Sequence, residues 1–238
     1  MKIYITRHGQ VCPEQFFGSV DFPTGDIPLS EKGQIQAKYL GMELKRLGFK
    51  GPIFSSPYRR TMMTSDIAAK ECGAKVYPDG ELREMFFSDE AAQEFAGMNI
   101  EKIKEEFLTV AEDAELPYPW WTKAMDNKEI IAKRLKAFWD KYIKLDFDEI
   151  LVVGHGASLF GSINYFNLKY GLRLPTVLAE LADFQAVYGL NCNLSCIEID
   201  NDGKLLNAKL YSTEHLADEL LTSNANPKPR QKALMFSV

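Results

Sequence analysis

The stretch KIYITRHGQ, residues 2–10, decides the fold of this chain. Its first part, from Ile3 to Thr6, is β-branched and aromatic, which predicts a short buried strand. The strand then meets Arg7-His8-Gly9, and a cation, an imidazole and a glycine continue a buried strand poorly. Because open α/β sheets bind ligands in the crevice at the carboxyl ends of their strands, we place a site at His8.

A second strand ends in the same way. Residues 149–153 are predicted to form a strand, because Ile150 to Val153 is a continuous apolar run typical of a central parallel strand, and Gly154-His155-Gly156 follows it. The chain has three histidines, and two of them therefore stand at strand ends beside a glycine, which lets the backbone approach a ligand closely. Arg60 follows another short predicted strand. Two arginines and two histidines are costly to assemble without an anion, and phosphate fits best because guanidinium binds it bidentately.

Helices and strands alternate along the chain, which predicts an α/β fold. Ser30 caps a helix that stops at Gly48, and another helix runs towards Cys72. The other strands are expected at residues 52–54, 74–77, 183–187, 193–199 and 204–211, the last two joined by the hairpin signal at 201–203.

From about residue 85 to 145 helices dominate, which predicts a helical insertion with helices at 99–111 and 126–145. The second has Asp126 as N-cap and Glu129 at the third helical position, a capping box. The aromatic connection LPYPWW, residues 116–121, fits the core of the insertion and a lid or pocket wall equally well. We predict one domain over 1–238, with a mobile tail at about 222–238.

Composition excludes several classes. The chain has 238 residues, 46% of them hydrophobic, and a net charge of −5, which argues against nucleic acid or an anionic membrane as the main partner. Its four cysteines show no CxxC pair, no leader-like segment opens the chain, and no apolar run approaches the roughly 18 residues of a membrane span. These features predict a reduced cytoplasmic protein. Without HExxH, a Walker loop, a complete dinucleotide fingerprint or a dense carboxylate cluster, we expect no metal and no cofactor.

Taken together, the ordered motifs resemble the histidine phosphatase superfamily, the phosphoglycerate mutase-like proteins. The resemblance runs from Met1 to about Leu216 and rests on Arg7-His8-Gly9, Asp26-x-Pro28-Leu29-Ser30-x-x-Gly33-x-x-Gln36-Ala37, Ser55-Ser56-Pro57-x-x-Arg60-x-x-x-Thr64, Leu82-x-Glu84, Gly154-His155-Gly156 and a late strand at 191–198. It implies a three-layer α/β/α sandwich with a mostly parallel central sheet and a helical insertion over the active site.

The resemblance also implies a mechanism. His8 attacks phosphorus and becomes phosphohistidine, so it must be neutral, with its other ring nitrogen held by a backbone carbonyl. Arg7, Arg60 and His155 cradle the phosphoryl oxygens. Glu84 protonates the leaving oxygen and then activates water, a role that a raised pKa would suit. The predicted substrate-binding set is completed by Gln10 and Gly156.

Neighbouring residues compete for some of these roles. The motif spacing selects Arg60 over Arg59, which we predict to be a surface charge, and Glu84 over Glu81. Arg83 is then predicted to be a surface or salt-bridge residue, and His215 a structural one. The segment from Val11 to Glu14 departs from the family pattern, because many members carry Ser or Thr and then Asn there.

Hydrolysis is favoured over a mutase reaction, because the mutases hold a second anionic centre with adjacent arginines in the insertion. Between Glu84 and His155 this chain has one arginine, Arg134. The function predicted is that of a phosphomonoester hydrolase acting on a small phosphorylated metabolite. Phosphoglycerate mutase-type transfer is one alternative, and a catalytically silent phosphate-binding protein is another; its signature, loss of a core residue, is absent.

Overall fold

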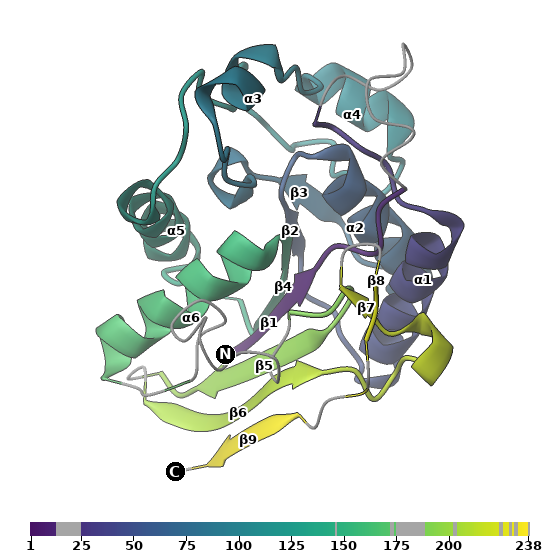
Figure 1. The fold of residues 1–238 in the computed structure, drawn as a ribbon. Coiled ribbons are helices and arrows are strands. Elements are labelled where there is room, and N and C mark those ends of the chain that lie inside the picture. The colour runs from purple at the N-terminus through teal and green to yellow at the C-terminus, as the bar shows by residue number, and fades with distance from the viewer. Residues whose placement is uncertain are drawn as a thin grey trace.

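A seven-stranded sheet forms the centre of the computed structural model, which describes residues 1–12, 25–145, 147–171, 174, 189–201, 204–223, 226–228, 230 and 233–237 (Figure 1). The strand order is β3-β2-β4-β1-β5-β6-β9. Strands β3, β2, β4 and β1 pair in parallel, whereas β5 is antiparallel to β1 and to β6, and β9 is antiparallel to β6. The strands are β1 (Lys2–Arg7), β2 (Ile53–Ser55), β3 (Val76–Pro78), β4 (Glu149–Gly154), β5 (Leu194–Ile199), β6 (Leu205–Ser212) and β9 (Leu234–Ser237), with a separate pair β7 (Thr222–Ser223) and β8 (Asn226–Pro227).

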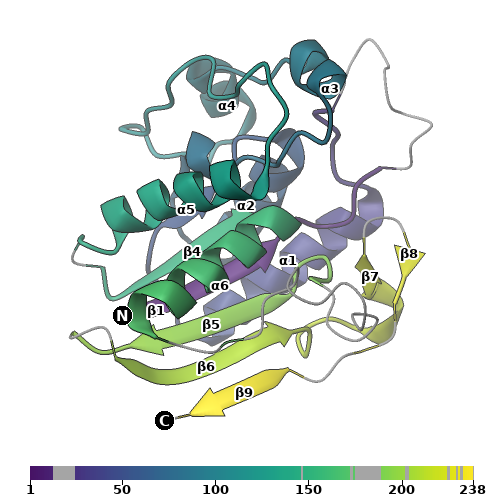
Figure 2. The same ribbon diagram turned by 60° about the vertical axis from the view of Figure 1, so that its left-hand side comes forward.

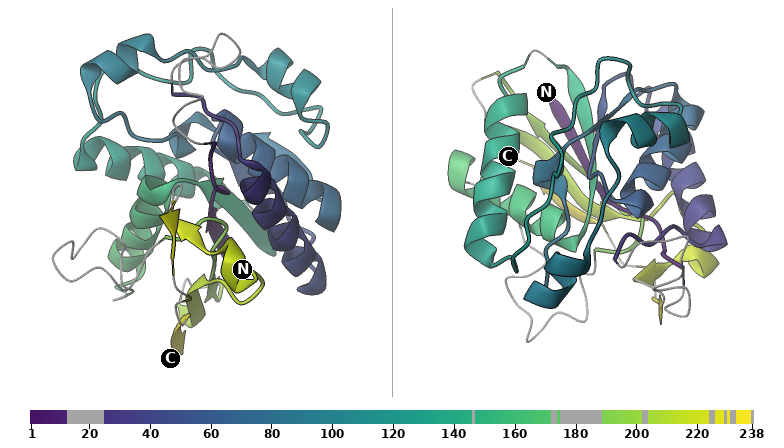
Figure 3. Two further views of the ribbon diagram at one scale, coloured as in Figure 1. Left: turned by 45° about the vertical axis from the view of Figure 1, so that its right-hand side comes forward. Right: turned by 90° about the horizontal axis from the view of Figure 1, so that it is seen from above.

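Helices cover both faces of this sheet. On one side lie α1 (Glu31–Arg46) and α2 (Arg59–Cys72), and on the other lie α5 (Lys128–Tyr142) and α6 (Gly156–Tyr170), as the view from above shows (Figure 3). The predicted three-layer α/β/α sandwich with a parallel core is therefore confirmed. In the described part of the chain, no helix has the length and apolar character needed to cross a membrane.

Strand β1 shows why the central strands read as unbroken apolar runs. Tyr4 packs into the cluster under α1 and α2, whereas Ile3 and Ile5 pack into the cluster under α5 and α6. All three side chains are at most 5% exposed. Alternate residues point to opposite faces of a strand, so a strand covered on both faces needs apolar residues at successive positions.

The start of α1 is fixed against the end of β1. The Ser30 hydroxyl accepts a hydrogen bond from the amide of Gly33 at 3.0 Å, which confirms the predicted N-cap. Gly33 itself packs against the loop after β1, because a Cβ there would lie 2.0 Å from the carbonyl oxygen of Gln10. At the other end Gly48 has a φ of +77°, so this stop signal is also confirmed.

The insertion lies beyond the end to which β1 points, with α3 (Asp89–Glu94) and α4 (Ile100–Glu106) above the sheet (Figures 1 and 2). The helix predicted at 99–111 ends at Glu106 instead. The reason is a competing partner: the amide of Val76 donates to Thr109 O, and the amide of Ala111 donates to Val76 O. Residues 109–111 therefore extend the edge of the sheet at β3.

The predicted capping box at the start of α5 is wrong. Asn127, not Asp126, is the N-cap, and its side-chain oxygen accepts from the amide of Ile130 at 2.9 Å. Asp126 is 4% exposed and binds the guanidinium of Arg83. Asp126 therefore forms a buried ion pair with a residue distant in sequence, although the local pattern predicts it to cap the helix.

The C-terminal region holds strands that the sequence did not predict. In the range where we predicted a mobile tail, β7 pairs with β8, and β9 pairs with β6 through the register Ala208↔Phe236. Two short 3₁₀ turns complete the described elements, η2 (Gly80–Leu82) and η3 (Asp218–Leu220). The strand expected at 183–187, the turn residues 202–203 and Glu14 lie outside the described residues.

We expect Gly33→Ala to destabilise the fold, although alanine is the better helix former. The added methyl group would overlap the Gln10 carbonyl, and overpacking of this kind costs about 1–3 kcal/mol. Urea unfolding of the variant and of Gln34→Ala, at the neighbouring exposed position, measures the effect. Equal free energies of unfolding for the two variants would contradict the packing argument.

Candidate active site

The register of β1 and β4 brings the two strand-end histidines together. Arg7 pairs with Gly154, and the backbone amide of His8 donates to Gly154 O at 2.9 Å. The rings of His8 and His155 are 5.3 Å apart between centroids, and the two residues are 3% and 0% exposed. The expectation that these residues meet at one edge of the sheet therefore holds in the structure.

His8 is held as a neutral imidazole with a defined tautomer. Its Nδ1 lies 2.7 Å from the carbonyl oxygen of Gly9, and since a carbonyl only accepts, Nδ1 carries the hydrogen. Burial lowers the pKa of His8 well below its usual value, and the charges of Arg60 and Arg7 lower it further. This leaves Nε2 with its lone pair, as a nucleophile requires.

Two guanidinium groups stand beside this histidine. Arg60 lies in the first turn of α2, is 8% exposed, and has its guanidinium 4.4 Å from the ring centroid of Tyr58. Arg7 donates to the carbonyl oxygen of Gly189 at 2.9 Å, and burial lowers its pKa, with Arg60 adding to the effect and Glu84 opposing it. The two positive charges repel each other, so an anion bound between them would relieve this repulsion and would itself be stabilised.

His155 connects the histidine pair to Glu84. Its Nε2 lies 2.8 Å from Ser56 Oγ, and its Nδ1 lies 3.4 Å from Glu84 Oε2. Burial lowers the pKa of His155 well below its usual value, with Arg60, His8 and Arg7 contributing, so the contact with Glu84 is not an ion pair. The Glu84 side chain is 19% exposed, and its Oε1 accepts from the amide of Met85 at 3.0 Å.

The other two predicted binding residues differ from these. The side-chain oxygen of Gln10 accepts from Ser30 Oγ at 2.8 Å, which ties it to the start of α1. Gly156 is the first residue of α6, and a Cβ there would meet no atom within 4 Å. The space beside Gly156 is therefore open, whereas Gln10 is engaged with the fold.

Three residues support the site that the sequence reasoning quoted in motifs but gave no role. Ser56 contacts His155, Thr64 Oγ1 accepts from the amide of Gly9 at 3.0 Å, and Asn191 Nδ2 donates to His8 O at 2.9 Å. Their place within the motifs could have pointed to this role, because polar side chains at those positions do not contribute to an apolar core. Thr64 and Asn191 hold the backbone of residues 8 and 9, whereas Ser56 holds the ring of His155.

Asp26 was also missed as a functional residue. It is 1% exposed, and its Oδ1 accepts from the amide of Arg59 at 2.6 Å, at the start of α2, where Tyr58 provides no side-chain cap. Burial raises the pKa of Asp26 to about 6, against the opposing hydrogen bond and the charges of Arg60 and Arg59. Next to it, the carbonyl oxygen of Gly25 accepts from Arg60 Nη1 at 3.2 Å, so this segment positions Arg60.

The prediction that Arg59 is a surface charge is wrong. Its side chain is 14% exposed and forms an ion pair with Glu106 in α4. One of its nitrogens also lies 3.4 Å from the sulfur of Met98. The insertion lies against the start of α2 and leaves this residue half-buried. His215, in contrast, lies 2.9 Å through Nε2 from the carbonyl oxygen of Cys192, in keeping with the structural role predicted for it.

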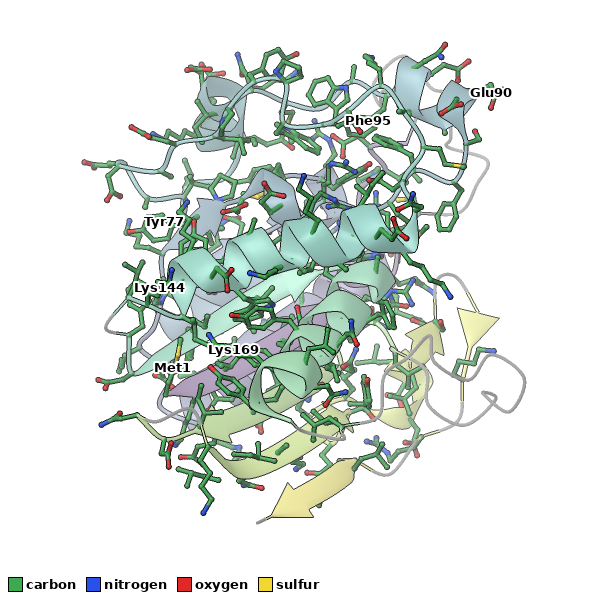
Figure 4. The ribbon with its side chains drawn as sticks, turned by 90° about the vertical axis from the view of Figure 1, so that its left-hand side faces the viewer. Met1, Tyr77, Glu90, Phe95, Lys144 and Lys169 are labelled. Carbon is green, nitrogen blue, oxygen red and sulfur yellow. The ribbon has the colours of Figure 1, made fainter. Side chains whose placement is uncertain are left out.

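The aromatic segment 116–121 belongs to the core and also lines a cavity. Trp120 and Trp121 are 7% and 8% exposed, and their ring centroids lie 5.4 and 5.3 Å from that of Phe95. Phe95 lies in the insertion, above the sheet (Figure 4). Trp120 also contacts Tyr58, whose ring lies 5.2 Å from that of His155. Both tryptophans line a cavity of about 720 Å³, together with Glu81, Arg83, Arg134 and Tyr142.

That cavity is distinct from the site at the two histidines, because its lining contains none of His8, Arg7, Arg60, Glu84 and His155. We place the chemistry at the histidines, where neutral imidazoles, cations and a carboxylate converge. In the described part of the chain, no group of three or more His, Cys, Asp or Glu residues could hold a metal ion.

Comparison with known proteins identifies the class. The family model for the histidine phosphatase superfamily, branch 1, matches residues 3–209, and the chain belongs to this family. A relative from Hydrogenobacter thermophilus, provisionally named phosphoserine phosphatase 2, is 27% identical over 164 residues, which is 66% of this chain and 74% of that protein. Another from Erwinia tasmaniensis, provisionally named phosphoglycerate mutase GpmB, is 25% identical over 242 residues and covers 93% of this chain and 97% of its own.

A solved structure shares the fold. The ecdysone phosphate phosphatase from Bombix mori, in complex with tungstate, superposes with a TM-score of 0.64. The match covers 83% of this chain and 88% of that chain at 16% sequence identity.

We expect His8 and His155 to remain neutral at pH 6, where a free histidine is mostly charged, because burial and the two arginines lower their pKa values. Long-range ¹H–¹⁵N spectra of the ring nitrogens report this directly, and His8 should show a protonated Nδ1. In urea all three histidines should titrate near their usual pKa. An imidazolium pattern for His8 at pH 6 in the folded protein would contradict the electrostatic argument.

We expect Asp26→Asn to gain stability relative to the wild type as pH rises. The pKa of Asp26 is about 6 in the folded state and lower in the unfolded state. Below about pH 4 the carboxyl group is protonated in both states, and as the pH rises from there through 6 the wild type loses stability, because ionisation favours the unfolded state. Between pH 4.5 and 7.5 the free energy of unfolding of the variant minus that of the wild type should rise by about 2 kcal/mol. Urea unfolding at both pH values measures it. A difference independent of pH would exclude a raised pKa.

Proposed function

We propose that the protein hydrolyses monoesters of phosphate, on a small phosphorylated metabolite, through a phosphohistidine formed on His8. One observation carries the proposal: a buried, neutral His8 has its Nδ1 committed to Gly9 O and stands beside the guanidinium groups of Arg7 and Arg60. Such a site attracts a phosphate dianion and offers it a nitrogen lone pair. Membership of the histidine phosphatase superfamily supports the same chemistry.

In the first step, His8 Nε2 attacks phosphorus, a nitrogen–phosphorus bond forms and the ester oxygen–phosphorus bond breaks. Glu84 gives its proton to the leaving oxygen, so the product alcohol departs neutral. Arg7, Arg60 and His155 bind the three non-bridging oxygens and stabilise the charge that they carry in flight. The hydrogen on His8 Nδ1 stays in its bond with Gly9 O, which stabilises the cationic phosphohistidine ring.

In the second step, water attacks the phosphohistidine. Glu84, now ionised, takes a proton from the water molecule as its oxygen bonds to phosphorus. The nitrogen–phosphorus bond breaks, inorganic phosphate leaves and His8 returns to its neutral tautomer. One carboxyl thus serves first as acid and then as base.

Hydrolysis is favoured over transfer between two positions of a phosphoglycerate. Arg134, the single arginine between Glu84 and His155, is 9% exposed and donates to the carbonyl oxygens of Glu81 and Arg83. Its Nη1 is therefore committed to the fold, and its charge is already opposed by Asp126, whose Oδ1 lies 3.7 Å from Arg134 Nη2. One relative carries a phosphatase name and another a mutase name, so we choose between the two reactions by the position of Arg134.

We also propose that the protein works in a reducing compartment, such as the cytoplasm. The cysteines at 12, 72, 192 and 196 are free. Burial raises the pKa of Cys192, which keeps its thiol protonated and unreactive.

The wild type is expected to release phosphate from p-nitrophenyl phosphate, and His8→Ala to lose at least about a thousandfold in kcat, because the covalent route disappears. His215→Ala is the matched control, since it removes a histidine bonded to Cys192 O. It should keep most of the activity. Rapid quenching with a ³²P-labelled monoester should trap acid-labile label on His8.

Two results would overturn the proposed function. One is phosphatase activity that survives in His8→Ala. The other is efficient interconversion of 3- and 2-phosphoglycerate without phosphate release from p-nitrophenyl phosphate. A wild type with neither activity, but with phosphate binding that His8→Ala weakens, would instead support a silent phosphate-binding protein.

A further inference from the structure

Three charged side chains are buried together behind Glu84. Arg83, Asp126 and Arg134 are 3%, 4% and 9% exposed. Arg83 binds the Asp126 carboxylate with two nitrogens, at 2.5 and 2.9 Å, and Arg134 Nη2 lies 3.7 Å from Asp126 Oδ1. Well-packed apolar residues often stabilise a fold as well as buried ions do, so stability alone does not account for this triad.

The hydrogen bonds that leave the triad hold the backbone on both sides of Glu84. Arg134 Nη1 donates to the carbonyl oxygens of Glu81 and Arg83, each at 3.0 Å. Asp126 Oδ2 accepts from the amide of Phe86 at 3.0 Å. The carbonyl oxygen of Glu84 itself accepts from Arg83 Nη1 at 3.3 Å.

Few other hydrogen bonds reach this backbone: the amide of Arg83 donates to Gly80 O at 3.2 Å, and the amide of Asp126 donates to Phe86 O at 3.1 Å. Residues 83–86 lie between the 3₁₀ turn η2 and α3 and belong to neither a helix nor a strand. The triad therefore fixes the direction in which the Glu84 side chain leaves the chain. That direction places Glu84 Oε2 at 3.4 Å from His155 Nδ1, beside the histidine pair.

We infer that the Arg83–Asp126–Arg134 triad is a positioning device that holds Glu84 against the substrate's leaving oxygen, an inference that rests on the proposed function. Asp126 and Arg134 come from the insertion, at the start of α5 and within it. The insertion thus orients Glu84, the general acid, whereas the carboxyl end of β1 holds His8, the nucleophile. Since proton transfer needs heavy atoms about 2.6–3.2 Å apart, a small rotation of residues 83–86 would uncouple Glu84 without disturbing His8.

The test compares two esters that differ in their need for a proton. Arg134→Met keeps the length of the side chain and removes the donors to Glu81 O and Arg83 O. Phenolate is a poorer leaving group than p-nitrophenolate, so loss of a positioned acid should lower kcat/KM for phenyl phosphate at least about tenfold more than for p-nitrophenyl phosphate. Arg134→Lys, which keeps the charge and one donor, should fall between Arg134→Met and the wild type.

Two further variants make the comparison specific. Lys133→Met, at the neighbouring exposed position of α5, should leave both rates unchanged. Glu84→Gln should show the same leaving-group pattern as Arg134→Met, and the double variant should fall little below Glu84→Gln, because both changes remove one function. If Arg134→Met does not fold, Arg134→Lys carries the same comparison.

Equal losses on both esters, or fully additive effects in the double variant, would overturn the positioning role. Failure of the proposed function would give a different result, because the wild type would then release no phosphate from either ester. In that case amide hydrogen exchange decides the inference. Faster exchange over residues 81–86 in Arg134→Met than in Lys133→Met would support it, and equal exchange would overturn it.

Discussion

The parallel pairing of β1 with β4 is the constraint on which the site depends. With Arg7 opposite Gly154, each strand delivers a histidine to the same edge at the same height. A slip of one residue would turn every side chain of β1 to the other face of the sheet, exchanging Tyr4 with Ile3 and Ile5 and removing His8 from His155. The two apolar clusters on the faces of the sheet therefore fix the register, and the register fixes the distance between the histidines.

Burial and charge then act together on this edge. Enclosing His8 and His155 disfavours their charged forms, and Arg7 and Arg60 add repulsion, so the imidazoles stay neutral beside two cations. The carboxyl group of Glu84 lies close enough to interact with these cations, and it opposes their charge once it has given up its proton. The fold divides the tasks spatially, with the nucleophile and the arginines on the sandwich and the acid supported by the insertion.

Local sequence was a good guide where local forces decide. Strand ends with histidine and glycine, the Ser30 cap and the Gly48 stop all depend on residues a few positions apart, and they were predictable. It failed where a distant partner competes. Asp126 reads as a helix cap but binds Arg83, 43 positions away, and Arg59 reads as a surface charge but meets Glu106, 47 positions away. No periodicity or spacing records such pairs, and β9 likewise forms only because β6 offers it an edge.

The charge of the pocket has a consequence for turnover. Arg7 and Arg60 are fixed in place by the Gly189 and Gly25 carbonyl oxygens, so they attract any phosphate dianion, whether or not it is esterified. Inorganic phosphate leaves the reaction with the same charge and geometry as the group that entered. We therefore expect the released phosphate to compete with the ester for the same two guanidinium groups, so that the product inhibits its own formation.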